Sequence, residues 1–303
     1  MSNVDVFLAE LNNNAKAYSK QVIDTRDSWG TFFYEEAEQL LSMAHASLGD
    51  SWPQTLIQGY ISFVIDVNKS QLIYEKDNKY KYARFDEVKN ETYKSDAFMA
   101  KYHWGVFVTT FAWGHHLRLI KFFQQQFLPY LKEEAGELVD LGAGSGVWHQ
   151  MFLRHRHNWQ VHSVDISPYS VDWAQRMAIG INTANKVTYQ LGDALTYSRD
   201  KLFDAAISCF LAEHLEDPSQ LFTNLANNLK THGYAFVTCA ITAAEIDHIF
   251  EFKSESEPIH LAQNAGFRVI ATLSAAPDRV PIHSKYLPRS MALVLQKKQG
   301  VIW

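Results

Sequence analysis

A glycine-rich segment follows a short apolar run near the middle of the chain. Residues 137–148 read ELVDLGAGSGVW, where Asp140 ends a β-type run and Gly142, Ala143 and Gly144 open a tight turn. Because glycine has no Cβ atom, the backbone can turn sharply here and approach a ligand closely. The free N–H groups at the start of the following helix suit a polar or anionic group. The segment predicts a ligand-binding loop, and a strand-to-helix turn without a ligand is its structural alternative.

Two further carboxylates follow the next two apolar runs. In VHSVDIS, Asp165 lies at the end of the next predicted strand, where an acidic side chain can accept hydrogen bonds from ribose hydroxyls. Asp193 lies in QLGDAL, where its carboxylate can accept from an adenine amino group and Ala194 offers a backbone N–H. The structural alternatives are a helix N-cap at Asp165 and a turn at Asp193. Together with Asp140, these residues indicate a site for a nucleoside.

The elements that must position these residues alternate between strands and helices. Strands are expected at 137–141, 160–165, 187–191, 203–209, 234–239, 267–273 and 291–296, and helices near 146–155, 169–179, 218–230 and 256–265. This alternation predicts parallel strands with crossover helices. Ligands of such sheets bind at the carboxyl ends of the strands, where the glycines and aspartates lie.

The N-terminal part of the chain has a different pattern, mostly helical and rich in aromatic residues. Helical spacing of apolar residues predicts helices over 34–47, from Pro53 onward, and over about 105–131. Residues 71–85 alternate weakly around Asp77 and Asn78, which predicts a β-hairpin. We expect this part to cover the strand ends as a cap.

The ordered series DLGAGSG, VDIS, GDA and FDAAISCFLAEHLEDP resembles the motifs of class I methyltransferases, which depend on S-adenosylmethionine. It is similar to the small-molecule type found in ubiquinone and menaquinone biosynthesis, over about residues 137–240. The resemblance implies an α/β fold: a Rossmann-like, seven-stranded, mostly parallel sheet with helices on both faces, in residues 133–303. Residues 1–132 would form the mainly helical N-terminal cap and substrate-binding region. The implied reaction is methyl transfer to a small-molecule acceptor, amino-acid-like or aromatic, with S-adenosylhomocysteine as product.

The resemblance also implies which residues hold the cofactor. The glycine loop and Asp140 would line its methionine part, Asp165 and its neighbour the ribose and adenine, and Asp193 and its neighbour the adenine edge. Two residues after the fourth strand would lie beside the sulfonium. The implied cofactor-binding residues are Asp140, Gly142, Ala143, Gly144, Asp165, Ile166, Asp193, Ala194, Phe210 and Leu211.

Two other functions are compatible with parts of this pattern. A nicotinamide-dependent oxidoreductase would have a G-x-G-x-x-G fingerprint, whereas this chain has G-x-G-x-G preceded by Asp140. A carboxylate at that place would repel a pyrophosphate but suits an aminoacyl group. The other alternative is a relative that binds the cofactor without methylating an acceptor, as a partner subunit.

The acceptor pocket is expected in the aromatic stretch 97–123. Tyr102, Trp104 and Trp113 are predicted to contact the acceptor, because aromatic faces can hold an apolar ring or a cation. Tyr34 is predicted to close over the acceptor from the N-terminal helices. An amphipathic core helix explains the same stretch equally well.

Two pairs of residues are candidates for a general base. His115 and His116 are adjacent, so from a helix we expect only one of them to point into the cavity. Glu213 and His214 follow the fourth strand, near the expected acceptor. No group of His, Cys, Asp and Glu has metal-ligand spacing, so the sequence predicts no metal site.

Composition limits the classes of partner. The formal net charge is −5 and the chain has no basic block, so we expect no nucleic-acid partner. It has no run of about 18 apolar residues, so no membrane association is expected. Cys209 and Cys239 lie in apolar runs and are expected to be core residues. These features favour a cytoplasmic protein; the sequence leaves the oligomeric state open, a homodimer included.

Overall fold

The computed structural model describes residues 1–89, 92–93, 95–279 and 284–299, and its centre is a seven-stranded sheet. The strand order is β3-β2-β1-β4-β5-β7-β6. Strands β1 to β5 pair in parallel, and β7 runs antiparallel between β5 and β6. The strands are β1 (Glu137–Leu141), β2 (Gln160–Asp165), β3 (Val187–Leu191), β4 (Phe203–Cys209), β5 (Leu229–Ile241), β6 (Phe267–Ala275) and β7 (Arg289–Lys297). All seven predicted strands are therefore confirmed.

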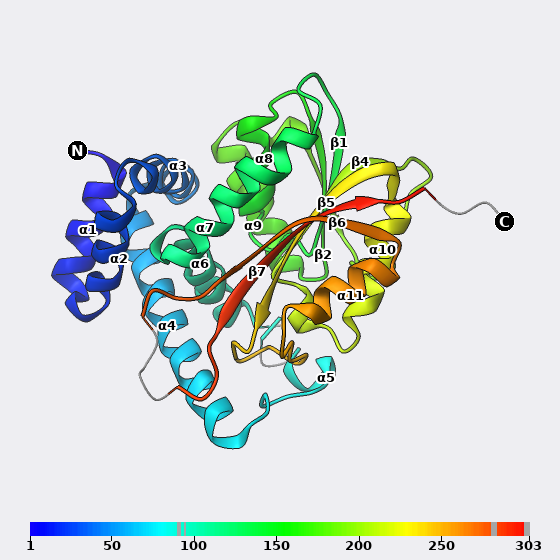
Figure 1. Ribbon diagram of the computed structural model, residues 1–303. Coiled ribbons are helices and arrows are strands. Elements are labelled where there is room, and N and C mark those ends of the chain that lie inside the picture. The colour runs from blue at the N-terminus through cyan, green and yellow to red at the C-terminus, as the bar shows by residue number, and fades with distance from the viewer. Residues whose placement is uncertain (90–91, 94, 280–283, 300–303) are drawn as a thin grey trace.

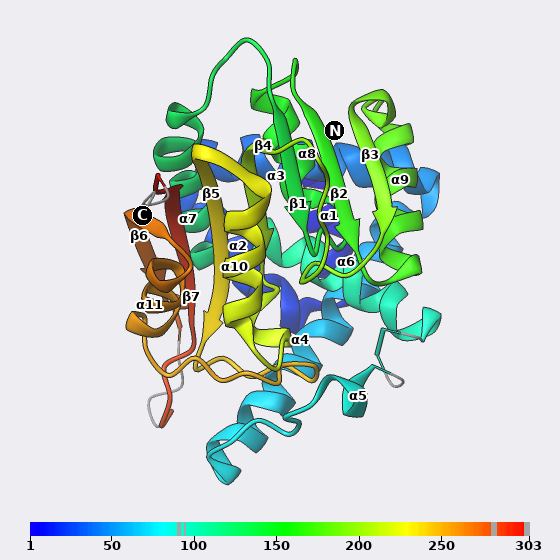
Figure 2. The same cartoon turned by 90° about the vertical axis from the view of Figure 1, so that its right-hand side faces the viewer.

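Helices cover both faces of this sheet, as predicted (Figures 1 and 2). On one face lie α10 (Pro218–Asn228) and α11 (Ser256–Asn264), and on the other lie α8 (Val147–His155) and α9 (Pro168–Gly180). The crossover helices begin where local chemistry favours it. Ser167 and Asp217 cap α9 and α10, each followed by a proline in the first turn.

The N-terminal half is helical and packs on the α8/α9 side of the sheet (Figure 1). Its helices are α1 (Asn3–Asn14), α2 (Lys16–Trp29), α3 (Thr31–Leu48), α4 (Trp52–Asp77), α5 (Phe85–Val88), α6 (Asp96–Ala112) and α7 (Gly114–Phe122). The predicted helix over 34–47 lies within α3, which ends at Gly49 with a φ of 62°. Among the described residues, no helix combines the length and the apolar character needed to cross a bilayer.

Two predictions for this half are wrong. The predicted hairpin over 71–85 does not form: residues 71–77 are the last part of α4, which is capped by Asn78 in the left-handed conformation, φ 57°, and 79–84 contain no strand. The helix continues because Tyr74 packs its buried ring against Tyr286, a contact between segments far apart in sequence. The predicted helix over 105–131 is broken at Trp113, whose backbone is extended. The break lets α7 turn and pack against β6 and β7.

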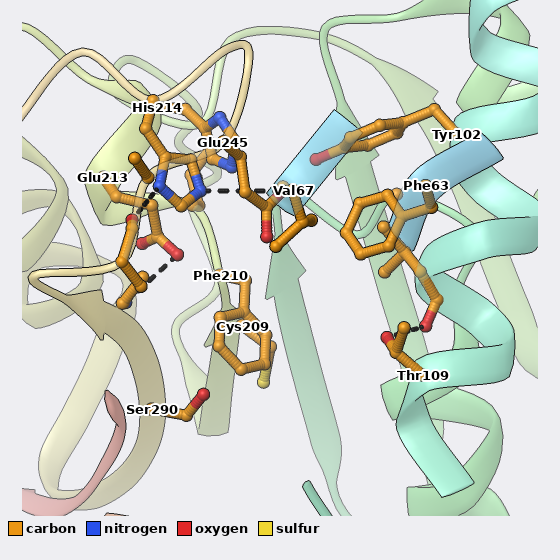
Figure 3. A pocket seen from close by; sticks show the side chains of 18 of the residues that line it. Phe63, Val67, Tyr102, Thr109, Cys209, Phe210, Glu213, His214, Glu245 and Ser290 are labelled. Carbon is orange, nitrogen blue, oxygen red and sulfur yellow. Dashed lines mark hydrogen bonds and ion pairs between the residues drawn. The ribbon is translucent and has the colours of Figure 1, made fainter. Parts of the chain in front are cut away.

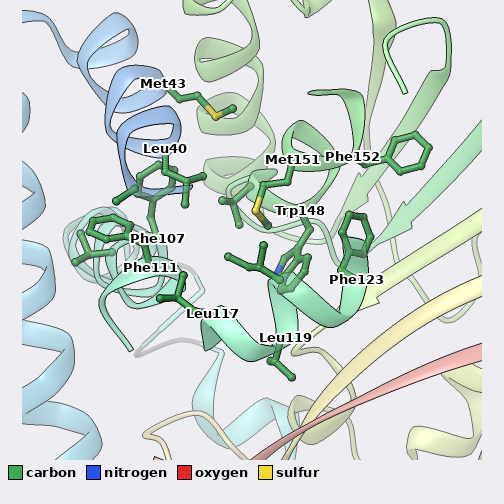
Figure 4. Close-up of a cluster of buried hydrophobic side chains, with 14 of the residues drawn as sticks. Leu40, Met43, Phe107, Phe111, Leu117, Leu119, Phe123, Trp148, Met151 and Phe152 are labelled. Atoms are coloured by element: carbon green, nitrogen blue, oxygen red, sulfur yellow. The ribbon is translucent and has the colours of Figure 1, made fainter. Parts of the chain in front are cut away.

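A continuous hydrophobic core joins the N-terminal helices to the sheet (Figure 4). Buried side chains come from helices in both parts of the chain: Leu40, Met43, Phe107, Phe111, Leu117, Leu119, Phe123, Trp148, Met151 and Phe152. Burying each large apolar side chain contributes roughly 1.5–3 kcal/mol. An ion pair crosses the same boundary, because Arg154 on α8 lies 2.7 Å from the buried Glu36 on α3. Shared packing therefore holds the N-terminal helices over the strand ends.

Candidate functional site

A cavity of about 1250 Å³ lies between the carboxyl ends of the parallel strands and the N-terminal helices. Phe63, Tyr102 and Thr109 line the helical wall, and Glu213 and His214 lie on the opposite wall (Figure 3). Nine of the ten implied cofactor residues line it: Gly142, Ala143, Gly144, Asp165, Ile166, Asp193, Ala194, Phe210 and Leu211. The fold therefore gathers in one cavity residues that the sequence places in four separate segments.

The glycine loop, residues 142–146, turns tightly at the end of β1. The N–H groups of Gly142 and Ala143 donate to the carbonyl of Val164, at 2.9 and 3.1 Å. Gly142 has a φ of 73°, and a Cβ atom there would lie 2.6 Å from Cδ2 of Leu211. Gly144 also has a positive φ, 54°. Glycine is required at Gly142 both by its left-handed backbone and by the close approach of Leu211.

Asp165 at the end of β2 joins the loop to the cavity. Its Oδ2 accepts from the backbone N–H of Gly144 and its Oδ1 from that of Ser167, both at 2.8 Å. Burial raises the pKa of Asp165, while these two N–H donors act to lower it. Ile166 beside it is 49% exposed. Asp165 therefore orders the loop and also offers a carboxylate to the cavity.

Asp193 follows β3 in a tight turn. Its Oδ1 accepts from the N–H of Leu195 at 2.8 Å, and its backbone carbonyl accepts from the N–H of Tyr197 at 2.9 Å. The carbonyl of Ala194 is held by the side-chain amide of Asn224 at 2.7 Å. Asp193 therefore forms the turn that was its structural alternative, and it also lines the cavity.

The structure does not place Asp140 at the cavity. Its side chain is 2% exposed, and Oδ2 lies 2.8 Å from Nδ1 of His149 on α8. Burial raises the pKa of Asp140, and His149 acts to lower it. Because this carboxylate turns inward to His149, its expected contact with a ligand is not reproduced.

Phe210 and Leu211 follow β4 at the centre of the sheet. Phe210 is left-handed, with a φ of 54°, a conformation that costs a non-glycine residue about 1–2 kcal/mol. Its N–H donates to both the carbonyl and the hydroxyl oxygen of Thr238, each at 3.0 Å, which holds this geometry. The ring lies 5.3 Å from the ring of His116, centroid to centroid.

Both adjacent histidines line the cavity, contrary to the expectation for a continuous helix. Because α7 starts at Gly114, directly after the break at Trp113, His115 and His116 lie in its first turn, with ring centroids 4.5 Å apart. Nδ1 of His116 donates to the carbonyl of Thr109 at 3.1 Å, which leaves Nε2 as an acceptor. Burial lowers the pKa of His115 to about 3, and lowers that of His116 well below 6.5. Both rings are therefore neutral at pH 7.

The predicted acceptor residues separate into two groups. Tyr102 and Trp113 line the cavity. Trp104 does not, because two residues along a helix lead to a different face, and it is buried against Trp173. Tyr34 is 40% exposed, packs on Phe33 and does not line the cavity. The predictions for Trp104 and Tyr34 are therefore not supported.

Glu213 and His214 lie in a short 3-10 turn, η5 (Ala212–His214), directly after β4. Glu213 is fully buried; its Oε1 accepts from the N–H of Ala240 at 3.2 Å, and its Oε2 has no partner among the described residues. Burial raises the pKa of Glu213 to about 7. Nδ1 of His214 lies 3.1 Å from the hydroxyl of Tyr93 and 3.2 Å from the carbonyl of Asp247.

Three polar residues in the loop after β5 join the site without having been predicted. Glu245 and His248 line the cavity, and Asp247 is buried beside them. Donor atoms of Glu213, His214 and His248 lie within 4.8 Å of one another. Metal-ligand spacing was not visible because the residues belong to separate segments. The available signal was the polar stretch EIDH within an apolar sequence. Cys239 is buried as expected, whereas Cys209 lines the cavity.

Comparison with known proteins gives a family match for the central part of the chain. Residues 139–237 match the family of methyltransferase domains. The biotin biosynthesis bifunctional protein BioHC of Teredinibacter turnerae is 28% identical over 159 residues, which are 46% of this chain. The matched segment spans only 28% of that relative's length.

Solved structures show the same fold at low sequence identity. Phosphoethanolamine N-methyltransferase 2 of Haemonchus contortus, in complex with S-adenosyl-L-methionine, is 16% identical with a TM-score of 0.53, over 72% of this chain and 61% of that one. A protein described as a sarcosine dimethylglycine methyltransferase of Galdieria sulphuraria is 16% identical with a TM-score of 0.52, over 60% and 86%. These similarities concern the fold.

Proposed function

We propose that the protein is a class I methyltransferase that methylates a small molecule with S-adenosylmethionine, because residues 139–237 match the family of methyltransferase domains and the strand ends meet at a large cavity. The observation that carries the proposal is a single cavity of about 1250 Å³ lined by both the glycine loop and the aromatic helices. Ligand sites usually measure roughly 300–1,000 Å³, so this cavity has room for a cofactor and a metabolite together. The proposed acceptor is amino-acid-like or aromatic.

The cavity residues fit the cofactor that the domain type implies. Gly142 and Gly144 would leave space for its methionine part, Asp165 would accept from the ribose hydroxyls, and Asp193 would meet the adenine edge; all four residues line the cavity. When bound, S-adenosylmethionine would supply a methyl group activated by its positively charged sulfur, for transfer to a lone pair of the acceptor. Phe210 is the residue we place beside that sulfur.

The helical wall would hold and orient the acceptor. Phe63, Tyr102 and Trp113 present aromatic rings to the cavity, and these rings can bind an apolar ring or an amine. His116 is our first candidate for the base, because its Nε2 is unprotonated at pH 7 and its ring contacts Phe210. Glu213, with its raised pKa, is the second candidate. Covering the strand ends with helices also excludes water from the displacement.

Calorimetry separates this proposal from its two alternatives. We expect S-adenosylhomocysteine to bind with micromolar affinity and NADH not to bind; the reverse result would support an oxidoreductase. Release of S-adenosylhomocysteine should then be measured across a panel of thiols, amines and phenols. Cofactor binding without turnover on any acceptor, with a related active methyltransferase as positive control, would support the partner-subunit alternative. We also propose a cytoplasmic location, and sedimentation would test for a homodimer.

A further inference from the structure

A group of ligand-type side chains lies in the cavity outside the set that fits the cofactor. It combines Glu213 and His214 of η5 with His248, which comes from the loop after β5, and their donor atoms lie within 4.8 Å of one another. All three side chains line the cavity, and each is at most 7% exposed. Glu245 lies alongside, with its carboxylate 3.8 Å from Nε2 of His248. Figure 3 shows Glu213, His214 and Glu245 gathered at one end of the cavity.

Hydrogen bonds fix the tautomer of both imidazoles and leave one ring nitrogen of each as a possible metal ligand. The carbonyl of Ala243 can only accept, so Nδ1 of His248, 2.7 Å away, carries the proton. The hydroxyl of Tyr93 donates to Asp247 at 2.9 Å and therefore accepts from Nδ1 of His214 at 3.1 Å. Nε2 of each ring keeps its lone pair and makes no hydrogen bond within the described chain. Histidines that ligate metals are oriented in this way, by an acceptor at the other ring nitrogen.

The carboxylate beside them lacks a partner. Oε2 of Glu213 is completely buried and makes no hydrogen bond to any described residue. Oδ1 of Asp247 is also buried and makes no hydrogen bond to any described residue. Among the described residues, no Lys or Arg pairs with Glu213, Glu245 or Asp247; the ion pairs of the last two involve only histidines. Buried carboxylates are ordinarily paired or bound to a cation.

Backbone contacts fix the two segments relative to each other. The N–H groups of Ile249 and Phe250 both donate to the carbonyl of Glu213 at 2.9 Å. These bonds attach the loop that carries His248 directly to the turn that carries the other two ligands. The three side chains therefore meet on a preformed frame.

We propose that Glu213, His214 and His248 bind one divalent transition-metal ion of the zinc type. Two imidazole nitrogens and one carboxylate oxygen are a ligand set of catalytic zinc sites, in which a further position stays open. All three side chains line the cavity that would hold the acceptor; with Glu213 bound to the ion, His116 is the remaining candidate base. Resting on the proposed function, the role we assign to the ion is to bind a thiol or hydroxyl of the acceptor, which ionises more readily beside a cation.

Metal binding can be measured without cofactor or acceptor. The chain is stripped with a chelator, dialysed and titrated with zinc chloride by calorimetry, and with cobalt(II) by visible absorption. We expect one zinc ion per chain with micromolar or tighter affinity, and magnesium chloride binding at least 100-fold more weakly, because magnesium prefers oxygen ligands. His248→Gln and Glu213→Gln should each weaken zinc binding at least tenfold.

The matched control is His260→Gln, at an exposed histidine of α11, which should bind zinc like the wild type. Unchanged affinity of His248→Gln for S-adenosylhomocysteine would show that this variant is folded. Zinc binding that is substoichiometric in the wild type, or equally tight in both ligand variants, would overturn the site. Zinc binding without methylation of any acceptor would refute the proposed function alone, whereas methylation at full rate after zinc removal would refute the role of the ion.

Discussion

Asp165→Asn tests whether the carboxylate at the end of β2 binds the cofactor. In the free protein this side chain accepts two backbone hydrogen bonds of 2.8 Å, from Gly144 and Ser167. Asparagine keeps the shape but loses the negative charge, and its NH2 group cannot accept. A hydrogen bond to a charged group contributes about 1.5–3 kcal/mol. If the ribose hydroxyls bind this carboxylate, the free energy of cofactor binding should fall by about 1–3 kcal/mol, which is about a 5-fold to 150-fold increase in Kd.

The assay is calorimetric titration with S-adenosylhomocysteine, with urea unfolding of the same samples. The control is Asp172→Asn on α9, where an exposed carboxylate is paired with Arg176 at 2.9 Å. This substitution should change neither the free energy of ligand binding nor that of unfolding by more than about 0.5 kcal/mol. The reasoning about the ribose would be refuted if Asp165→Asn were less stable but bound the ligand as tightly as the wild type. Asp165 would then only hold the glycine loop.

Three further predictions concern stability. His115 has a folded pKa of about 3 against 6.5 in the unfolded chain, so the unfolded state binds the proton more tightly and stability falls as the pH drops below 6.5. Between pH 7.5 and pH 5, the free energy of unfolding measured in urea should fall by about 2 kcal/mol more for the wild type than for His115→Gln. An equal fall for both proteins would contradict this. Gly142→Ala should destabilise the loop by about 1–3 kcal/mol, and adding Leu211→Ala should restore the steric part; no recovery would show that Leu211 is not the obstacle. Glu36→Gln leaves Arg154 without its carboxylate and should cost about 3 kcal/mol in thermal or urea unfolding, with affinity for S-adenosylhomocysteine unchanged; reduced affinity would mean that the ion pair also shapes the cavity.

Local patterns in the sequence were sufficient for the sheet and for most of the cofactor site. Strand periodicity, helix caps and prolines act within a few residues, so each strand and crossover helix could be predicted from a short window. Gly142 and Gly144 follow from the turn itself, since their positive φ values are a local requirement. Asp165 and Asp193 lie at strand ends, and parallel strands bring those ends to one edge.

Tertiary packing decided which of the remaining side chains reach the cavity. Asp140 pairs with His149 instead of lining the cavity, and the break at Trp113 brings both His115 and His116 into it. The group of Glu213, His214 and His248 exists only because the loop after β5 is bonded to the turn after β4. Such contacts join residues far apart in the chain, and their geometry depends on how whole elements pack, which no short sequence pattern encodes.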